Sequence, residues 1–276
     1  MDSRYEQGPT EASRMSTSEL RENFLVEDLM KTDQFSFLHT HYDRSVIGTA
    51  IPATIELELP NFDNMKSNYF LERRELGIIN IGGPGEVILD DAVYQVGQLD
   101  AVYVGKGNKK VIFRSRFPEN PAKYYLYSVP ANKRYPNAFM RKEEASPIEL
   151  GQIETANRRT IYKYIHQDGI PSCQLVMGVT VLSPGSTWNT MPAHTHDRRM
   201  ETYFYFDLPS DQVIFHLMGQ PWATRHLVTQ NHQAIISPPW SIHSGVGTSN
   251  YSFVWAMAGE NQDFTDMDPV KITDLR

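Results

Sequence analysis

Cysteine is almost absent from this chain of 276 residues, in which Cys173 is the single one. One thiol cannot form a disulfide within the chain, so we expect the fold to depend on its core and Cys173 to be a small buried apolar residue. A long apolar run is also lacking, and the polar, charged N-terminus has no signal-peptide hydrophobic region. We therefore predict a soluble, cytoplasmic protein with no membrane partner.

Positive charge is in the minority, with 26 Lys and Arg against 33 Asp and Glu and a formal net charge of −7. A negatively charged chain has little electrostatic attraction for nucleic acids or anionic membranes. The apolar residues make up 40% of the chain, which is ample for a core. The length allows one large domain or two domains of ordinary size.

Helical periodicity is also scarce. Residues 18–30 place Leu20 and Phe24 at helical spacing, with Ser16 or Ser18 as the N-cap, and predict one short helix. The other regular segments are short alternating apolar runs between turns, which predict an all-β sandwich or barrel. The clearest of these runs are residues 35–41, 55–59, 77–81, 101–104, 124–129, 174–182, 202–206, 213–218 and 251–257.

One cluster of polar residues stands among the predicted strands. His194-x-His196 is followed by Glu201 at the start of an apolar run and, much later, by His243. Side chains alternate along a strand, so His194 and His196 point to the same side. Three imidazoles and one carboxylate are a ligand set for zinc, iron, manganese, nickel or cobalt, and spacing alone does not choose among these metals. The pattern predicts a metal site.

The chain contains a second, diverged copy of this region, because residues 72–81 align with 197–206 and residues 100–110 align with 233–243. The ligand positions of the first copy hold Tyr69, Leu71, Leu76 and Lys110. All four ligands are therefore lost together, which is not expected of mere packing residues. We predict two modules, a metal-less one over residues 1–145, which includes the helical segment, and a metal-binding one over residues 146–276.

Other histidines are weaker candidates. His39-Thr-His41 imitates the metal pair, but Val46 stands at the offset where the glutamate is required. His216, His226 and His232 lie among the later strands, and only their residue type would recommend them as ligands. We expect none of these five to bind the metal.

A small β-barrel that holds a metal at its mouth from three strands is the cupin plan, and two copies form a bicupin. This chain departs from the usual cupin motifs at two turns. Trp240 stands where the second motif normally has a glycine, and Asp207-Leu-Pro209 replaces the glycine turn that normally ends the first motif. These departures leave the fold intact and separate the chain from germin-like and dioxygenase branches.

Longer motifs make the chain resemble the 5-keto-4-deoxyuronate isomerase family, also called 4-deoxy-L-threo-5-hexosulose-uronate ketol-isomerases. The motifs are Phe70-Leu-Glu-Arg-Arg-Glu-Leu-Gly77, Tyr103-Val-Gly-Lys-Gly107, Asn157-Arg-Arg-Thr160, Pro184-Gly-x-x-Trp-Asn-Thr-Met-Pro192, His194-Thr-His-x-Arg-Arg-Met-Glu201, Met218-Gly-Gln-Pro221, Ser241-Ile-His-Ser-Gly-Val-Gly-Thr248 and Gly259-Glu-Asn-Gln262. The resemblance covers the chain from about Leu20 to Arg276 and implies a bicupin homohexamer with one zinc per chain, in the C-terminal cupin. The reaction it implies is an intramolecular oxidoreduction in bacterial pectin breakdown, from 5-dehydro-4-deoxy-D-glucuronate to 3-deoxy-D-glycero-2,5-hexodiulosonate.

The group that moves the proton or hydride is not identified by spacing, and proton transfer and hydride shift both stay open. Glu201 is committed as a ligand, so the catalytic candidates are Tyr203, Lys163 and Glu260, with Tyr205 on the same strand parity as Tyr203. A substrate carboxylate favours a guanidinium fork. The candidates for this contact are Arg158, Arg159, Arg198, Arg199 and Arg225.

Two functions of other classes use the same residues. A cupin oxygenase would bind iron at the four ligands, and a non-catalytic bicupin would bind a sugar acid without converting it. Metal analysis, oxygen consumption and product analysis separate these alternatives from an isomerase.

Overall fold

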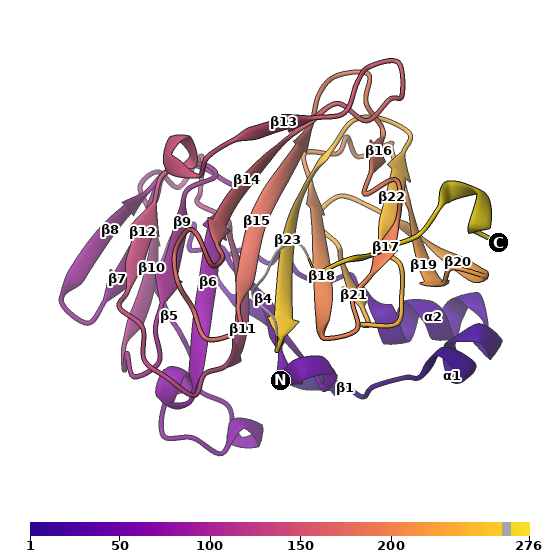
Figure 1. The fold of residues 1–276 in the computed structure, drawn as a ribbon. Coiled ribbons are helices and arrows are strands. Elements are labelled where there is room, and N and C mark those ends of the chain that lie inside the picture. Colours follow the sequence, from indigo (N-terminus) through magenta and orange to yellow (C-terminus); the bar gives the residue numbers. More distant parts are fainter. Residues whose placement is uncertain (261–265) are drawn as a thin grey trace. The chain divides into compact units, whose positions relative to one another are not determined.

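A computed structural model describes residues 1–260 and 266–276, and it consists mainly of strands (Figure 1). The chain divides into two compact units. The first contains Met1–Arg4, Asp28–Ser146 and Lys163–Met177, and the second contains Tyr5–Glu27, Pro147–Tyr162 and Gly178–Arg276. The helical segment therefore groups with the second unit, whereas the predicted division at residues 145 and 146 counted it with the first module. That division stays a prediction.

The first unit contains a seven-stranded sheet in the order β1-β3-β4-β11-β6-β9-β12 and a four-stranded sheet in the order β5-β10-β7-β8. Its strands are β1 (Asp2–Arg4), β3 (Phe35–Thr40), β4 (Val46–Ala50), β5 (Leu57–Glu58), β6 (Arg74–Asn80), β7 (Gly85–Leu89), β8 (Ala92–Val96), β9 (Ala101–Val104), β10 (Val111–Ser115), β11 (Tyr124–Pro130) and β12 (Ala138–Met140). β1 and β3 pair in parallel, and the other neighbouring strands in the two sheets of this unit pair antiparallel.

The second unit has the same two kinds of sheet. Its larger sheet runs in the order β13-β14-β15-β23-β18-β21-β2, its four-stranded sheet in the order β16-β22-β19-β20, and β17 pairs with β24. The strands are β2 (Leu25–Val26), β13 (Ile148–Leu150), β14 (Arg159–Ile165), β15 (Val176–Leu182), β16 (Trp188–Asn189), β17 (His194–Thr195), β18 (Arg199–Phe206), β19 (Ile214–Gln220), β20 (Ala223–Thr229), β21 (Ala234–Ser237), β22 (Ser244–Gly247), β23 (Ser252–Gly259) and β24 (Asp268–Pro269). The prediction of an all-β fold is confirmed.

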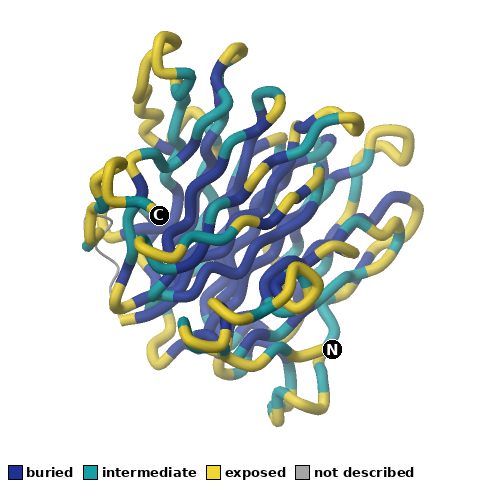
Figure 2. The backbone as a smooth tube through the Cα atoms, turned by 90° about the vertical axis from the view of Figure 1, so that its right-hand side faces the viewer, coloured by how far each residue is buried: buried dark blue, intermediate teal, exposed yellow. Residues whose placement is uncertain are grey.

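Burial follows the strands. Figure 2 shows buried backbone along the sheets and exposed backbone at turns and chain ends. β18 is buried at all of its residues, because it pairs with β21 on one side and β23 on the other. In the first unit, Leu71, Leu76 and Phe113 belong to one continuous apolar core. Two positions that would be metal ligands in the second copy are therefore packing residues here.

The helices differ from the prediction. The structure has α1 (Pro9–Arg14), α2 (Thr17–Phe24) and the short 3-10 helices η1 (Tyr42–Arg44), η2 (Asp63–Met65), η3 (Phe70–Glu72), η4 (Lys142–Glu144) and η5 (Ile272–Asp274). Ser16 caps α2 in a capping box with Glu19. The predicted helix to residue 30 is too long, because Leu25 turns extended and pairs with Ile235 of β21. None of the described helices is long and apolar enough to cross a membrane.

Cys173 is partly exposed, so the prediction of a buried packing residue is wrong. The physical reason is its backbone. The amide N–H groups of Cys173, Gln174 and Leu175 donate to the buried carboxylate of Glu75 at 2.8–3.0 Å. This loop is held by its main chain, and the thiol faces the backbone of Lys133 instead of the core.

Candidate metal centre and cavity

Four side chains of the second unit converge. Nε2 of His194 lies 3.2 Å from Nε2 of His196 and 3.0 Å from Nε2 of His243. Oε2 of Glu201 lies 3.0 Å from Nε2 of His243 and 3.4 Å from Nε2 of His196. His194 is half-buried and the other three are buried. These four residues have ligand atoms within 4.8 Å of one another, so the residues predicted as ligands do meet.

Strand pairing places these side chains. Glu201 of β18 lies opposite Ser237, the last residue of β21, and the chain then turns at a Pro-Pro pair. The carbonyl oxygen of Pro239 in that turn accepts a hydrogen bond from the backbone N–H of His196 at 3.2 Å. His243 directly precedes β22. One turn therefore brings the segment that carries His196 beside the segment that leads to His243.

The donor set fits a divalent cation. Three Nε2 atoms and a carboxylate oxygen converge, and each can offer a lone pair to a common cation. Oε2 of Glu201 is buried and has no hydrogen-bond partner within the described residues. Burial, and then the neighbouring His243 and His196, lower the pKa of His194 to about 2. Burial by itself would raise the pKa of Glu201, but His243 and His196 outweigh burial and keep it low. Neutral imidazoles beside an ionised carboxylate are the protonation states that bind a metal.

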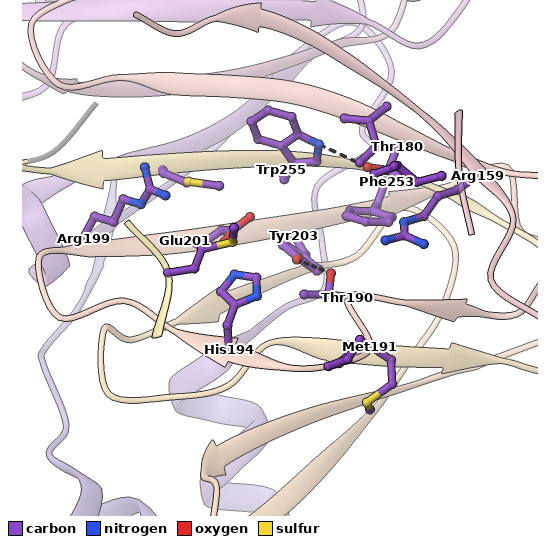
Figure 3. Close-up of a pocket in the computed structure, with 15 residues that line it drawn as sticks. Arg159, Thr180, Thr190, Met191, His194, Arg199, Glu201, Tyr203, Phe253 and Trp255 are labelled. Carbon is purple, nitrogen blue, oxygen red and sulfur yellow. Dashed lines mark hydrogen bonds between the residues drawn. The ribbon is translucent and has the colours of Figure 1, made fainter. Parts of the chain in front are cut away.

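A cavity of about 260 Å³ adjoins this group. His194 and Glu201 line it together with Arg159, Tyr203 and Phe253 (Figure 3). The remaining lining residues are Leu150, Ile161, Thr180, Thr190, Met191, Pro192, Arg199, Trp255, Met257 and Met267. Ligands at one wall of a cavity with mostly apolar sides are typical of a small-molecule site.

Tyr203 is the one member of the predicted catalytic set that lines this cavity. Its hydroxyl shares a hydrogen bond with Oγ1 of Thr190 at 2.8 Å, and its ring centroid lies 4.6 Å from that of Phe253. Burial raises its pKa well above the usual range, so the phenol stays protonated. Lys163 of β14 does not line the cavity, and the exposed Glu260 pairs with an arginine outside the cavity.

Three of the predicted arginines have other partners. Arg158 is exposed and lies 3.2 Å from Glu149. Arg198 is exposed and forms an ion pair with Glu260. Arg225 donates to carbonyl oxygens at the C-terminal end of α1 at 2.8–3.3 Å. None of the three lines the cavity.

The other two arginines line the cavity and differ in their partners. Arg199 is buried, and its Nη2 lies 2.6 Å from Oδ1 of Asp266, while its Nε lies 3.4 Å from Nδ1 of His196. Arg159 donates from Nη1 to the backbone carbonyl oxygen of Asn157 at 2.9 Å. Burial lowers the pKa of the Arg159 guanidinium.

Within the described residues, neither the His39-Thr-His41 pair nor the first copy of the repeated region forms a comparable group of side chains. His39 and His41 stack edge to face at 5.2 Å, but neither belongs to a group of metal-ligand side chains among the described residues. Lys110 is exposed and lies 3.8 Å from Glu58, and Tyr69 precedes η3. The difference between the two copies that the alignment predicts is therefore present in three dimensions.

Sequence reasoning did not find several residues of the site. Thr190 lies opposite Tyr203, and Trp255 donates from its indole N–H to Oγ1 of Thr180 at 3.2 Å. Asp266 approaches Nδ1 of His196 at 3.6 Å. Thr190 lies within the motif of residues 184–192, where no role was assigned to it, and Thr180, Trp255 and Asp266 lie outside the motifs. Only the register of the sheet brings them to the cavity.

The fold and the site define a cupin-like protein with a three-histidine, one-glutamate group able to hold a metal ion. The sequence narrows this class further. The chain belongs to the KduI/IolB family, whose sequence model matches residues 24–272.

Relatives match over the full length. A protein of Formosa agariphila, named 4-deoxy-L-threo-5-hexosulose-uronate ketol-isomerase, is 55% identical over 100% of this chain and 98% of its own. A protein of the same name from Shouchella clausii is 54% identical over 100% of both chains. The resemblance stated from the motifs is confirmed at the level of the family.

Solved structures agree on the fold. An IolB-like protein from Salmonella typhimurium LT2 superposes with a TM-score of 0.73 at 14% identity and covers 90% of this chain and 97% of its own. An oxalate decarboxylase from Lactobacillus farciminis, in a formate complex, has a TM-score of 0.60 at 9% identity and covers 90% and 88%. At such identities the likeness shows the fold alone.

Proposed function

We propose that this protein is a metal-dependent ketol-isomerase that converts 5-dehydro-4-deoxy-D-glucuronate into 3-deoxy-D-glycero-2,5-hexodiulosonate during pectin breakdown. The observation that carries the proposal is the complete group of His194, His196, Glu201 and His243, of which His194 and Glu201 line a cavity. The names of relatives that are more than 50% identical over the full length support the substrate.

We assign one zinc ion per chain to these four residues, because nitrogen and oxygen donors of this kind suit zinc. Bound there, zinc would supply a Lewis acid that polarises a carbonyl group next to a hydroxyl group. The reaction moves hydrogen between two neighbouring carbons, so both oxygens of that pair must be held. The protein's part is to hold the substrate against the ligand wall.

The cavity residues divide this task. The protonated hydroxyl of Tyr203 can donate a hydrogen bond to a substrate oxygen, with Thr190 fixing its direction at 2.8 Å. Phe253 and Trp255 form apolar walls that exclude water. Excluding water strengthens each polar contact with the substrate and protects a reactive intermediate.

Product analysis tests this function. Purified protein is incubated with 5-dehydro-4-deoxy-D-glucuronate, and we expect the 2,5-hexodiulosonate as product with no oxygen consumed. His243→Ala should abolish turnover, while the β-sheet circular dichroism is kept. Oxygen consumption with bound iron would indicate an oxygenase instead, and binding without product would indicate a sugar-acid binding protein.

Metal analysis is the companion measurement. We expect about one equivalent of zinc per chain, and a sharp loss in the double variant His194→Ala, His196→Ala. The matched control is His39→Asn, His41→Asn, which changes a pair of the same spacing outside the cluster. Two equivalents in the unchanged protein, or metal loss in the control, would contradict a single site in the second unit.

We further propose that the protein forms a homo-oligomer. The family resemblance implies that this oligomer is a hexamer. Phe215 of β19, Val228 of β20 and Trp222 in the turn between them expose apolar surface that a second copy can cover. Sedimentation at micromolar concentration should give several times the chain mass, and a fully active monomer would refute the assembly.

We also assign the protein to the cytoplasm, a reducing compartment in which a partly exposed thiol such as Cys173 persists.

A further inference from the structure

The two ends of the cavity differ in chemistry. The ligand group, with His194 and Glu201, forms one part of the wall. Figure 3 shows the side chain of Arg159 on the far side of Tyr203 and Phe253 from Arg199. The cavity therefore has a metal-binding region and, separately, a cationic region.

Arg159 has free hydrogen-bonding capacity, unlike Arg199, the other arginine that lines the cavity. A guanidinium carries five N–H donors, and that of Arg159 makes one hydrogen bond within the described residues, to the carbonyl oxygen of Asn157. No carboxylate of the described residues forms an ion pair with it, whereas Arg199 lies 2.6 Å from Asp266. The fork of Arg159 is thus available to a ligand in the cavity.

The mostly apolar surroundings of Arg159 make its unpaired charge energetically unfavourable unless an anion binds. Phe253 and Ile161 line the cavity beside it, and the nearby polar groups of Thr180 and Thr190 bond to Trp255 and Tyr203. The guanidinium is partly buried, and this burial lowers its pKa because it disfavours the charged form. A partly buried cation without a counter-ion is unfavourable, and a bound carboxylate offsets this cost through two parallel N–H···O bonds.

We propose that Arg159 binds the carboxylate of an open-chain 2-oxo acid, and that this contact orients the substrate with its opposite end at His194 and Glu201. The inference rests on the proposed function, in which the substrate carries a 2-oxo acid at one end of a six-carbon chain and the reacting aldehyde at the other. One guanidinium at the far end of the cavity then fixes which end meets the ligand group. Arg159 acts by binding and not by transferring hydrogen.

Kinetics of Arg159→Met, with Arg158→Met as the matched control, test the proposal. Arg158 is the neighbouring residue, is exposed and pairs with Glu149 outside the cavity. Loss of a charge-assisted carboxylate contact should raise KM of Arg159→Met roughly 10- to 150-fold, with zinc content unchanged. Arg159→Lys keeps the positive charge but loses the two parallel N–H donors, so its KM should lie between that of the unchanged protein and that of Arg159→Met. If the KM of Arg159→Met stays within about twofold of the KM of the unchanged protein, the loss is too small for a charge-assisted contact and the inference is overturned.

A binding measurement separates this inference from the proposed function. Pyruvate and its neutral amide are titrated against the tryptophan fluorescence of the unchanged protein, because Trp255 lines the cavity. Pyruvate should quench and the amide should not, and quenching should be lost in Arg159→Met and kept in Arg158→Met. This result without turnover of the uronate would keep the carboxylate site and reject the isomerase. Turnover with pyruvate quenching unaffected by Arg159→Met would keep the isomerase and reject the carboxylate site.

Discussion

At the scale of single residues, Tyr203 and Tyr205 show how position along one strand decides a role. Both are buried on β18, two residues apart. The hydroxyl of Tyr203 meets Thr190 in the cavity, whereas the hydroxyl of Tyr205 lies 2.7 Å from Nδ1 of His216 and does not line the cavity. The same side chain thus serves the cavity at one position and the core at the other.

Replacing each hydroxyl tests this difference. Tyr203→Phe keeps the ring against Phe253 and removes the donor, so kcat of the proposed isomerisation should fall on the order of 100-fold. Tyr205→Phe should leave kcat nearly unchanged and lower the free energy of unfolding by about 1 kcal/mol, because His216 loses its partner. Steady-state kinetics and urea unfolding of both variants provide the comparison. Equal kcat in Tyr203→Phe and the unchanged protein would remove Tyr203 from the site.

At the scale of elements, close packing of β15 against β23 shapes the cavity wall. Gly178 of β15 faces the indole of Trp255 of β23, and a β-carbon at this position would overlap the indole ring and the carbonyl oxygen of Tyr162. Glycine is required here because the neighbouring chain approaches too closely for any side chain. The orientation of a cavity-lining residue therefore depends on a glycine in another strand.

Gly178→Ala should destabilise the fold and displace Trp255. We expect a loss of about 1–3 kcal/mol in the free energy of unfolding, which is typical of overpacking, together with a shift of the tryptophan emission. A double-mutant cycle with Trp255→Phe is the control, since the smaller ring relieves part of the overlap and the two losses should not add. Strict additivity would show that the indole is not the group displaced.

Helix α1 packs through its buried Ala12 and is also held at its C-terminal end by one side chain of β20. Arg225 donates from Nη1 to the carbonyl oxygens of Ala12 and Ser13 and from Nη2 to that of Met15. The last carbonyls of a helix have no partner within the helix, so a cation at this end satisfies them. Arg225 is thereby occupied in holding the helix.

Arg225→Met should release α1 without impairing the cavity. Amide hydrogens of residues 9–14 should exchange markedly faster in hydrogen–deuterium exchange, while those of β6 in the first unit stay unchanged. KM for the uronate should also stay unchanged, in contrast to Arg159→Met. A KM increase in Arg225→Met would show that this arginine, and not Arg159 alone, contributes to substrate binding.

At the scale of the whole molecule, two similar units have different interiors. The first unit fills its core with apolar side chains such as Leu71, Leu76 and Phe113. The second keeps a cavity whose mostly apolar lining includes the polar groups of His194 and Glu201. A filled core stabilises a fold, whereas a cavity beside a group of buried polar side chains does not, so we propose scaffolding for the first unit and chemistry for the second.

The first unit also makes folding stability depend on pH through His39. Burial, and then the nearby charges of Arg74 and His41, lower the pKa of His39 to about 4. The folded chain keeps His39 neutral, whereas the unfolded chain binds a proton below its ordinary value of about 6.5. His39 therefore reduces stability progressively as the pH falls from about 6.5 to about 4, and has no such effect above this window.

Urea unfolding of the zinc-loaded protein across this window tests the assignment. The unfolding midpoint should decrease as the pH falls, and His39→Gln should show a smaller decrease. Between pH 6.5 and 8 the two proteins should have parallel pH profiles, which serves as the internal control. Equal decreases at acidic pH would show that other groups account for the whole effect.

The sequence by itself determined the strand-rich fold, the family and the group of four side chains, able to hold a metal ion, that the structure brings together. Alternation of apolar residues and the spacing from His194 to Glu201 are local properties, and a strand's two faces follow from backbone geometry alone. The tertiary structure decided the rest: the end of α2 at Phe24, the placement of Thr190 opposite Tyr203, and which arginine faces the cavity. These depend on which strands pair and in which register, and that choice follows from packing between segments far apart in the chain.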